Sequence, residues 1–201
     1  MNNVQVPDTP WMHPSEINLI LGFLQPNDIM LEWGCGGSTV LFSKYVKEYY
    51  SIEHNKEWYE QVNKKISETN LKNIKFFHVP TDDGINKDFL PPDEGKKLTH
   101  KERYSTYSKF PSKLGVKFDK ILIDGRARQF CVEECIPHLE KDGLVIFHDF
   151  WMKGRDRYRD VALKYFDEVA SIIYSAQTLA ILKPKPQIMP PKAVETVGLF
   201  K

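Results

Sequence analysis

Apolar runs rich in β-branched and aromatic residues alternate along this chain with segments whose apolar residues recur at helical spacing. The pattern predicts strands over residues 28–33, 49–53, 74–79, 118–124, 144–148, 168–174 and 178–182. It predicts helices over residues 14–24, 39–45, 56–69, 129–139 and 157–165. Strands that alternate with helices favour an α/β fold, with a mostly parallel sheet of seven strands and helices on both faces. The last two strands are only a few residues apart, so we expect a hairpin and an antiparallel last strand.

The size and composition of the chain fit one globular domain over residues 1–201. The chain is 41% apolar and 27% charged, and its formal charge of +1 offers no overall attraction to nucleic acid or to an anionic membrane. Three cysteines, an odd number, argue against a disulfide framework. No apolar run approaches the roughly 18 residues that span a bilayer, and residues 1–10 lack the apolar core of a signal peptide. The sequence therefore predicts a cytoplasmic protein with no membrane span.

Two segments depart from the alternation. Residues 81–117 form a long polar stretch with little strand or helix signal, and loops of this length are usually functional lids or solvated insertions. From Asp93 to Lys120 the chain holds eight Lys or Arg and four Asp or Glu, so a lid that recognises an anionic substrate is one hypothesis and a solvated insertion is the other. Residues 184–201 hold four prolines, which predicts an extended C-terminal tail.

A glycine-rich turn follows the first predicted strand. Gly34, Gly36 and Gly37 allow the backbone to approach a ligand closely, and the next helix offers free N–H groups there, with Ser38 as its predicted cap. Glu32 lies two residues before the first glycine, where a carboxylate can bind a cationic amino group or hold the loop. This turn therefore predicts a ligand site at the carboxyl end of the sheet.

Glu53 ends the second predicted strand, 19 residues after Gly34. A carboxylate at this position can accept hydrogen bonds from ribose hydroxyls, which indicates a nucleoside-binding site, and we expect His54 to line the same site. The dinucleotide fingerprint G-x-G-x-x-G is incomplete, because Thr39 stands in place of the third glycine. An NAD-dependent oxidoreductase nevertheless remains an alternative.

Together these motifs resemble the class I S-adenosylmethionine (SAM)-dependent methyltransferases, whose first motif is an acidic residue followed by x-G-x-G. The resemblance covers about residues 11–184, including the terminal hairpin, and implies a Rossmann-like fold with SAM as cofactor. By this resemblance Glu32 and residues 34–38 would hold the methionine part of SAM, and Glu53 the ribose. Asp82, just after the third strand, would lie near the adenine.

Acidic residues also end the fourth and fifth predicted strands. Asp124 follows the apolar run 121–123, and His148 and Asp149 follow the run 145–147. A carboxylate after such a buried strand must be solvated, paired or bound to something. Asp124, His148 and Asp149 are therefore the candidate catalytic residues, and Asp124 is also expected to contact the cofactor.

This arrangement resembles metal-dependent O-methyltransferases that act on catechols and sugars. The resemblance implies that Asp124 and Asp149 bind Mg²⁺ or another divalent cation, which lowers the pKa of the acceptor hydroxyl. The match is imperfect, since His148 stands where an acidic residue is expected and Arg126 stands where some sugar methyltransferases have an acidic base. A mechanism in which His148 or Asp124 is the base, without a metal, therefore competes. In the non-catalytic alternatives, His148 has a structural role and bonds to the backbone, and Asp149 caps the helix that follows.

The sequence segments IDGRAR at 123–128 and HDFW at 148–151 are similar to those of a group of methyltransferases that accompany glycan-building enzymes. Some members are fused to glycosyltransferases, including in large algal viruses. The resemblance implies a sugar hydroxyl as acceptor, such as a deoxyhexose like rhamnose in a glycan, nucleotide- or lipid-linked. It also implies that the chain could be a domain of a larger glycan-building protein. Five aromatic residues could supply a stacking surface for a sugar ring, namely Trp11, Tyr104, Tyr107, Phe110 and Trp151. Of these, Trp11 and Trp151 could equally be packing residues.

Other functions remain open. An RNA or DNA methyltransferase would use the basic segment and further arginines and lysines, namely Arg126, Arg128, Lys153, Arg155, Arg157 and Arg159. Against it, Asp156 and Asp160 interleave these charges, and the same arginines could bind a phosphate on a sugar donor. A catechol-like acceptor and a non-catalytic binding module are the remaining alternatives, and the module would leave Asp124, His148 and Asp149 without a role.

Overall fold

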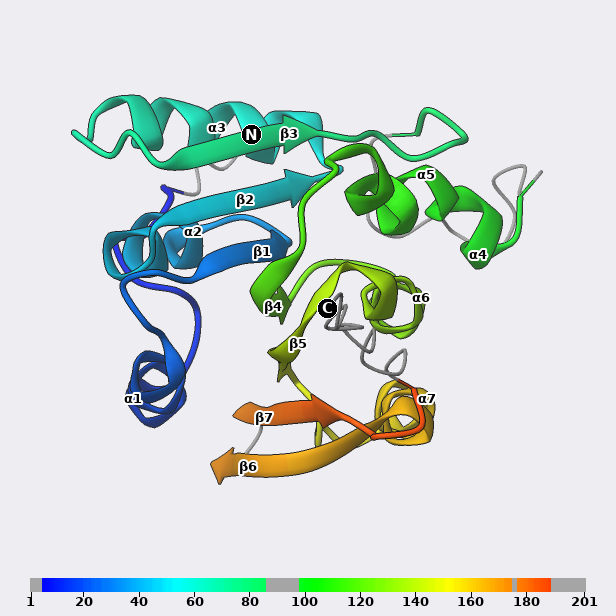
Figure 1. Cartoon of the computed structure of the whole chain (residues 1–201). Helices are drawn as coiled ribbons and strands as arrows, with labels where there is room; N and C mark the ends of the chain where they lie inside the picture. Colours follow the sequence, from blue (N-terminus) through cyan, green and yellow to red (C-terminus); the bar gives the residue numbers. More distant parts are fainter. Residues whose placement is uncertain (1–4, 86–97, 175–176, 189–201) are drawn as a thin grey trace, which may run out of the picture.

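The computed structural model describes residues 5–85, 98–174 and 177–188, which form one seven-stranded sheet with helices on both sides (Figure 1). The strands are β1 (Ile29–Trp33), β2 (Glu48–Glu53), β3 (Ile74–His78), β4 (Phe118–Ile123), β5 (Leu139–His148), β6 (Phe166–Tyr174) and β7 (Gln177–Pro184). Their order across the sheet is β3-β2-β1-β4-β5-β7-β6. β1 to β5 pair in parallel, while β7 runs antiparallel to both β5 and β6. The predicted α/β class, with its antiparallel last strand, is confirmed.

The helices cover two separate cores. They are α1 (Pro14–Phe23), α2 (Gly37–Phe42), α3 (Lys56–Ser67), α4 (His100–Arg103), α5 (Ser105–Lys109), α6 (Arg128–Glu134) and α7 (Asp156–Tyr165). Successive side chains of β4 point to opposite faces of the sheet. Ile121 and Ile123 therefore pack into the core under α5, α6 and α7, whereas Leu122 packs under α1 and α2. No helix among the described residues is long and apolar enough to cross a membrane.

The second half of the predicted lid is helical and packed, contrary to the expectation of an irregular segment. Thr99 and Glu102 form a reciprocal capping box at the start of α4, a signal present in the sequence that the strand and helix periods did not reveal. Tyr104 and Tyr107 then enter the core and are 1% and 0% exposed. Residues 86–97 of the predicted lid, and residues 189–201 of the predicted tail, lie outside the described residues.

β5 begins earlier than predicted. Leu139 already pairs with Phe118 of β4. A register shift then follows, and regular pairing begins with Leu144 and Lys120. Residues 140–142 between them are exposed and polar, so the apolar pattern of a strand is interrupted there. The predicted start at Leu144 is therefore the point from which the strand pairs regularly with β4.

The loops after β1 and β4 touch backbone to backbone. Gly34 has φ +93°, and a Cβ there would lie 2.4 Å from the Cα of Gly125. A Cβ on Gly125 would in turn lie 2.2 Å from the hydroxyl oxygen of Tyr107. Both positions therefore require glycine, and this contact sets the distance between the two strand ends.

We expect Gly34→Ala to lower the free energy of unfolding by about 2–4 kcal/mol, since it adds a left-handed backbone strain to a backbone clash. The matched control is Gly22→Ala in α1, where a Cβ meets nothing within 4 Å. That substitution should raise stability by about 0.5–1 kcal/mol through helix propensity. Urea unfolding of both variants measures the difference, and equal stabilities would contradict the close contact.

Candidate active site

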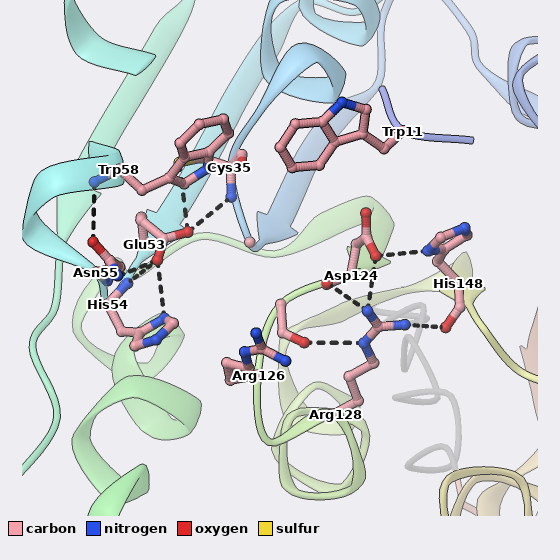
Figure 2. A pocket seen from close by; sticks show the side chains of 12 residues that line it. Trp11, Cys35, Glu53, His54, Asn55, Trp58, Asp124, Arg126, Arg128 and His148 are labelled. Atoms are coloured by element: carbon pink, nitrogen blue, oxygen red, sulfur yellow. Dashed lines mark hydrogen bonds and ion pairs between the residues drawn. The ribbon is translucent and has the colours of Figure 1, made fainter. Parts of the chain in front are cut away.

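One pocket of about 490 Å³ lies at the carboxyl ends of the central strands. Its lining residues are Trp11, Gly34, Cys35, Glu53, His54, Asn55, Trp58, Asp124, Gly125, Arg126, Arg128 and His148. Figure 2 shows Glu53, His54 and Trp58 on one side and Asp124, Arg128 and His148 on the other. The structure thus brings together five of the predicted site residues, namely Gly34, Glu53, His54, Asp124 and His148. Such a crevice at strand ends is where ligands bind in open parallel sheets.

Glu53 is the acidic residue on the β2 side of this pocket. Its carboxylate accepts hydrogen bonds from the backbone N–H of Cys35 at 3.2 Å, of His54 at 2.8 Å and of Asn55 at 2.7 Å. The ring nitrogen Nδ1 of His54 lies 2.9 Å from the same carboxylate. Glu53 therefore connects the loop after β1 to the loop after β2.

Asn55 and Trp58 are pocket residues that the sequence reasoning missed. Asn55 caps α3, because its side chain accepts from the backbone N–H of Trp58 at 3.0 Å. The indole N–H of Trp58 donates to the carbonyl of Cys35 at 2.7 Å. An asparagine directly before a predicted helix is a capping signal that could have identified the first of them.

Glu32 lies beneath the glycine loop and does not line the pocket. It is fully buried and accepts hydrogen bonds from the hydroxyls of Ser38, Thr39 (2.6 Å) and Ser51 (2.8 Å). Burial raises the pKa of Glu32 to about 7, although these hydroxyls act against the shift. Of its two predicted roles, the structure favours holding the loop. The expected cap role of Ser38 is wrong, because the cap position is Gly36, whose N–H donates to Thr39.

Gly37 and Asp82 also lie away from the pocket. A Cβ on Gly37 would lie 2.2 Å from the carbonyl oxygen of Thr9. The absence of a side chain at Gly37 therefore lets the N-terminal segment, and not a ligand, approach the backbone there. The carboxylate of Asp82 accepts from the backbone N–H of Thr106 at 2.9 Å and from its hydroxyl. Asp82 thus attaches α5 to the loop after β3, and no described contact directs it to the pocket.

The aromatic residues divide between the pocket rim and the core. Trp11 is 64% exposed and stacks on Trp58 with ring centroids 5.4 Å apart. Tyr104 and Tyr107 present their rings to His54 from within the core, so they offer no free surface to a sugar. Phe110 packs against the same core, and Trp151, partly buried there too, has the guanidinium of Arg159 over its ring. Among the predicted stacking residues Trp11 alone lines the pocket.

The other side of the pocket is a network of paired charges. Nδ1 of His148 lies 2.7 Å from a carboxylate oxygen of Asp124. Arg128 lies 3.0 Å from the Asp124 carboxylate and donates to that of Asp149 at 2.8 Å. Arg155 donates to the same oxygen of Asp149, whose backbone has φ 61°. Asp149 is therefore held by two arginines and does not line the pocket.

His148 is a cation at neutral pH in this setting. Burial lowers the pKa of His148, but the charge of Asp124, its hydrogen bond to the ring, and the nearby carboxylates of Glu16 and Asp149 outweigh burial and raise it to about 10. Conversely, burial raises the pKa of Asp124, while His148 and Arg128 outweigh it and hold that pKa below its usual value. Nε2 of His148 faces Oε1 of the fully buried Glu16 at 3.6 Å, beyond a normal hydrogen bond.

The predicted metal ligands do not fit a divalent cation. The guanidinium of Arg128 lies between Asp124 and Asp149, which were the expected ligands. Over residues 5–85, 98–174 and 177–188, no group of three or more His, Cys, Asp or Glu side chains could hold a metal ion. A positive side chain thus takes the place where the sequence predicted Mg²⁺.

Comparison with solved structures identifies the fold. The chain is similar to a methyltransferase-like protein from Silicibacter pomeroyi (TM-score 0.65, 21% identity, 92% of this chain and 93% of that chain). It is similar to a ribosomal protein L11 methylase from Lactobacillus delbrueckii subsp. bulgaricus (TM-score 0.61, 12% identity, 89% and 83%). It also resembles a protein from Streptococcus mutans, assigned as a methyltransferase and bound to SAH (TM-score 0.58, 13% identity, 87% and 100%). No family model and no curated protein sequence matches the chain. The chain therefore has the Rossmann-like methyltransferase fold.

Proposed function

We propose that this protein is a SAM-dependent methyltransferase. The observation that carries the proposal is the carboxylate of Glu53, which ends β2 and lines the pocket beside Gly34 and the glycine loop. A carboxylate there can accept both ribose hydroxyls of a bound nucleoside. The SAH bound to the Streptococcus mutans protein of the same fold supports a SAM-derived ligand.

We further propose a hydroxyl of a sugar as the methyl acceptor, a deoxyhexose such as rhamnose being the first choice. The resemblance of the segments after β4 and β5 to glycan-associated methyltransferases supports this choice, and the exposed Trp11 at the pocket rim offers a ring on which a sugar can stack. The acceptor oxygen would attack the methyl carbon of SAM as the bond from that carbon to sulfur breaks and SAH leaves. The hydroxyl proton would pass to the carboxylate of Asp124, which lines the pocket, and from there to Nδ1 of neutral His148, 2.7 Å away.

A nucleic-acid acceptor has less support from the charges. Arg128 and Arg155 are paired with Asp149, and Arg159 lies 3.2 Å from Asp156 and 3.4 Å from Asp160. Several of the basic residues that the sequence offered for phosphate contacts are thus already paired with carboxylates. The incomplete dinucleotide fingerprint likewise favours SAM over NAD.

We expect Glu53→Ala to weaken SAM binding at least about tenfold, because the loss of hydrogen bonds to a charged acceptor costs roughly 1.5–3 kcal/mol. Calorimetric titration measures the affinity, with Glu57→Ala as the control, since Glu57 is an exposed acidic residue of α3 outside the pocket lining. Because Glu53 also holds two loops, a melting curve must show that the variant is folded. Unchanged SAM affinity in a folded variant would refute the ribose assignment, and binding of NAD in place of SAM would refute the proposed function.

The raised pKa of His148 predicts the pH dependence of methyl transfer. Below its pKa of about 10 the ring is mostly protonated, so the fraction able to accept a proton rises roughly tenfold per pH unit toward that value. Turnover on a rhamnoside acceptor at saturating SAM should therefore rise from pH 7 to pH 9. Asp124→Asn removes the carboxylate through which the proton leaves the acceptor, so its turnover should fall well below that of the original protein across this pH range.

NMR titration of the His148 ring checks the cause of this profile without any acceptor. We expect the ring to stay protonated at pH 8 in the original protein and to lose its proton at lower pH in Asp124→Asn. A His148 that titrates near its ordinary pKa of 6.5 would contradict the assignment of charges in the pocket.

A further inference from the structure

Arg128 occupies a cage made entirely of oxygen atoms. Its nitrogens donate to the backbone carbonyls of Gly125, Asp124 and His148 at 2.9, 2.8 and 2.6 Å. Its guanidinium also lies 3.0 Å from the carboxylate of Asp124 and 2.8 Å from that of Asp149. The side chain is only 10% exposed. Carbonyl and carboxylate oxygens are the ligands that hard divalent cations take, so the cage has the chemistry of a cation site with an arginine in it.

The charges around this cage are already balanced. Three acidic side chains and three basic ones take part: Glu16, Asp124, Asp149, Arg128, His148 and Arg155. All of these side chains are buried or partly buried. A divalent cation would add two positive charges to this set, and buried charges without partners are costly.

We propose that Arg128 is a built-in cation, which takes the place of a divalent metal between Asp124 and Asp149 so that the site needs no metal. It acts as a positioning residue, because its donors connect the end of β4 to the end of β5 (Figure 2). His148 is thereby kept beside Asp124 on the pocket wall. The inference rests on the proposed function for the role of these residues, but its test requires neither SAM nor acceptor.

The test is titration with Mn²⁺, which prefers the same oxygen ligands and whose free form gives an electron paramagnetic resonance signal. Protein is added to micromolar Mn²⁺, and the loss of signal measures binding. Four variants accompany the full original chain. Arg128→Ala empties the cage, Arg128→Lys keeps a positive charge in it, Asp149→Asn removes one carboxylate, and a double variant combines Arg128→Ala with Asp149→Asn.

We expect the original protein and Arg128→Lys to leave the Mn²⁺ signal unchanged, and Arg128→Ala to bind Mn²⁺. The double variant Arg128→Ala, Asp149→Asn should lose that binding. A structural role alone would not make Arg128→Lys and Arg128→Ala differ in this way. Melting curves identify folded variants.

Two results would overturn the proposal. One is Mn²⁺ binding by the original protein that Asp149→Asn abolishes, and this arm remains decisive even if Arg128→Ala does not fold. The other is a folded Arg128→Ala that binds no Mn²⁺. Failure of SAM to bind in the calorimetric titration would refute the proposed function and leave this result unaffected.

Discussion

The backbone contact between Gly34 and Gly125 governs the geometry of the whole site. β1 and β4 are neighbours in the sheet, and the loops that leave them meet without any side chain between them. This closeness brings the glycine loop of one strand next to the acidic end of the other. It also lets Tyr107 reach Gly125, so α5 packs against the loop after β4 from within the core.

The carboxylates on the two sides of the pocket have different kinds of partner. On the β2 side, Glu53 is satisfied by backbone N–H groups and by His54, and these bonds organise the loops that a nucleoside would meet. On the β5 side, the carboxylates of Asp124 and Asp149 are neutralised by side-chain cations. Because an unpaired buried charge is costly, removing one partner of these pairs should destabilise the protein more than breaking an exposed ion pair would.

The same pairing determines the chemistry that is available. A histidine next to one carboxylate holds its proton more tightly, and Asp124 and Asp149 both act on His148. A base of this kind is strong when neutral but seldom neutral at pH 7. Under the proposed function, methyl transfer at this site would therefore depend on the state of one proton.

The order of strands and helices and the residues at the carboxyl edge of the sheet could be predicted from the sequence alone. Apolar periodicity is a local property, and the spacing from Gly34 to Glu53 follows from one strand, one turn and one helix. The contacts that those residues make could be seen only in the folded structure. Asp82 and Thr106 are far apart in the chain, as are Arg128 and Asp149, and the burial of Tyr104 depends on a surface built by other segments. Such contacts depend on how distant segments pack, which is why a predicted metal pair proved to be two carboxylates held by an arginine.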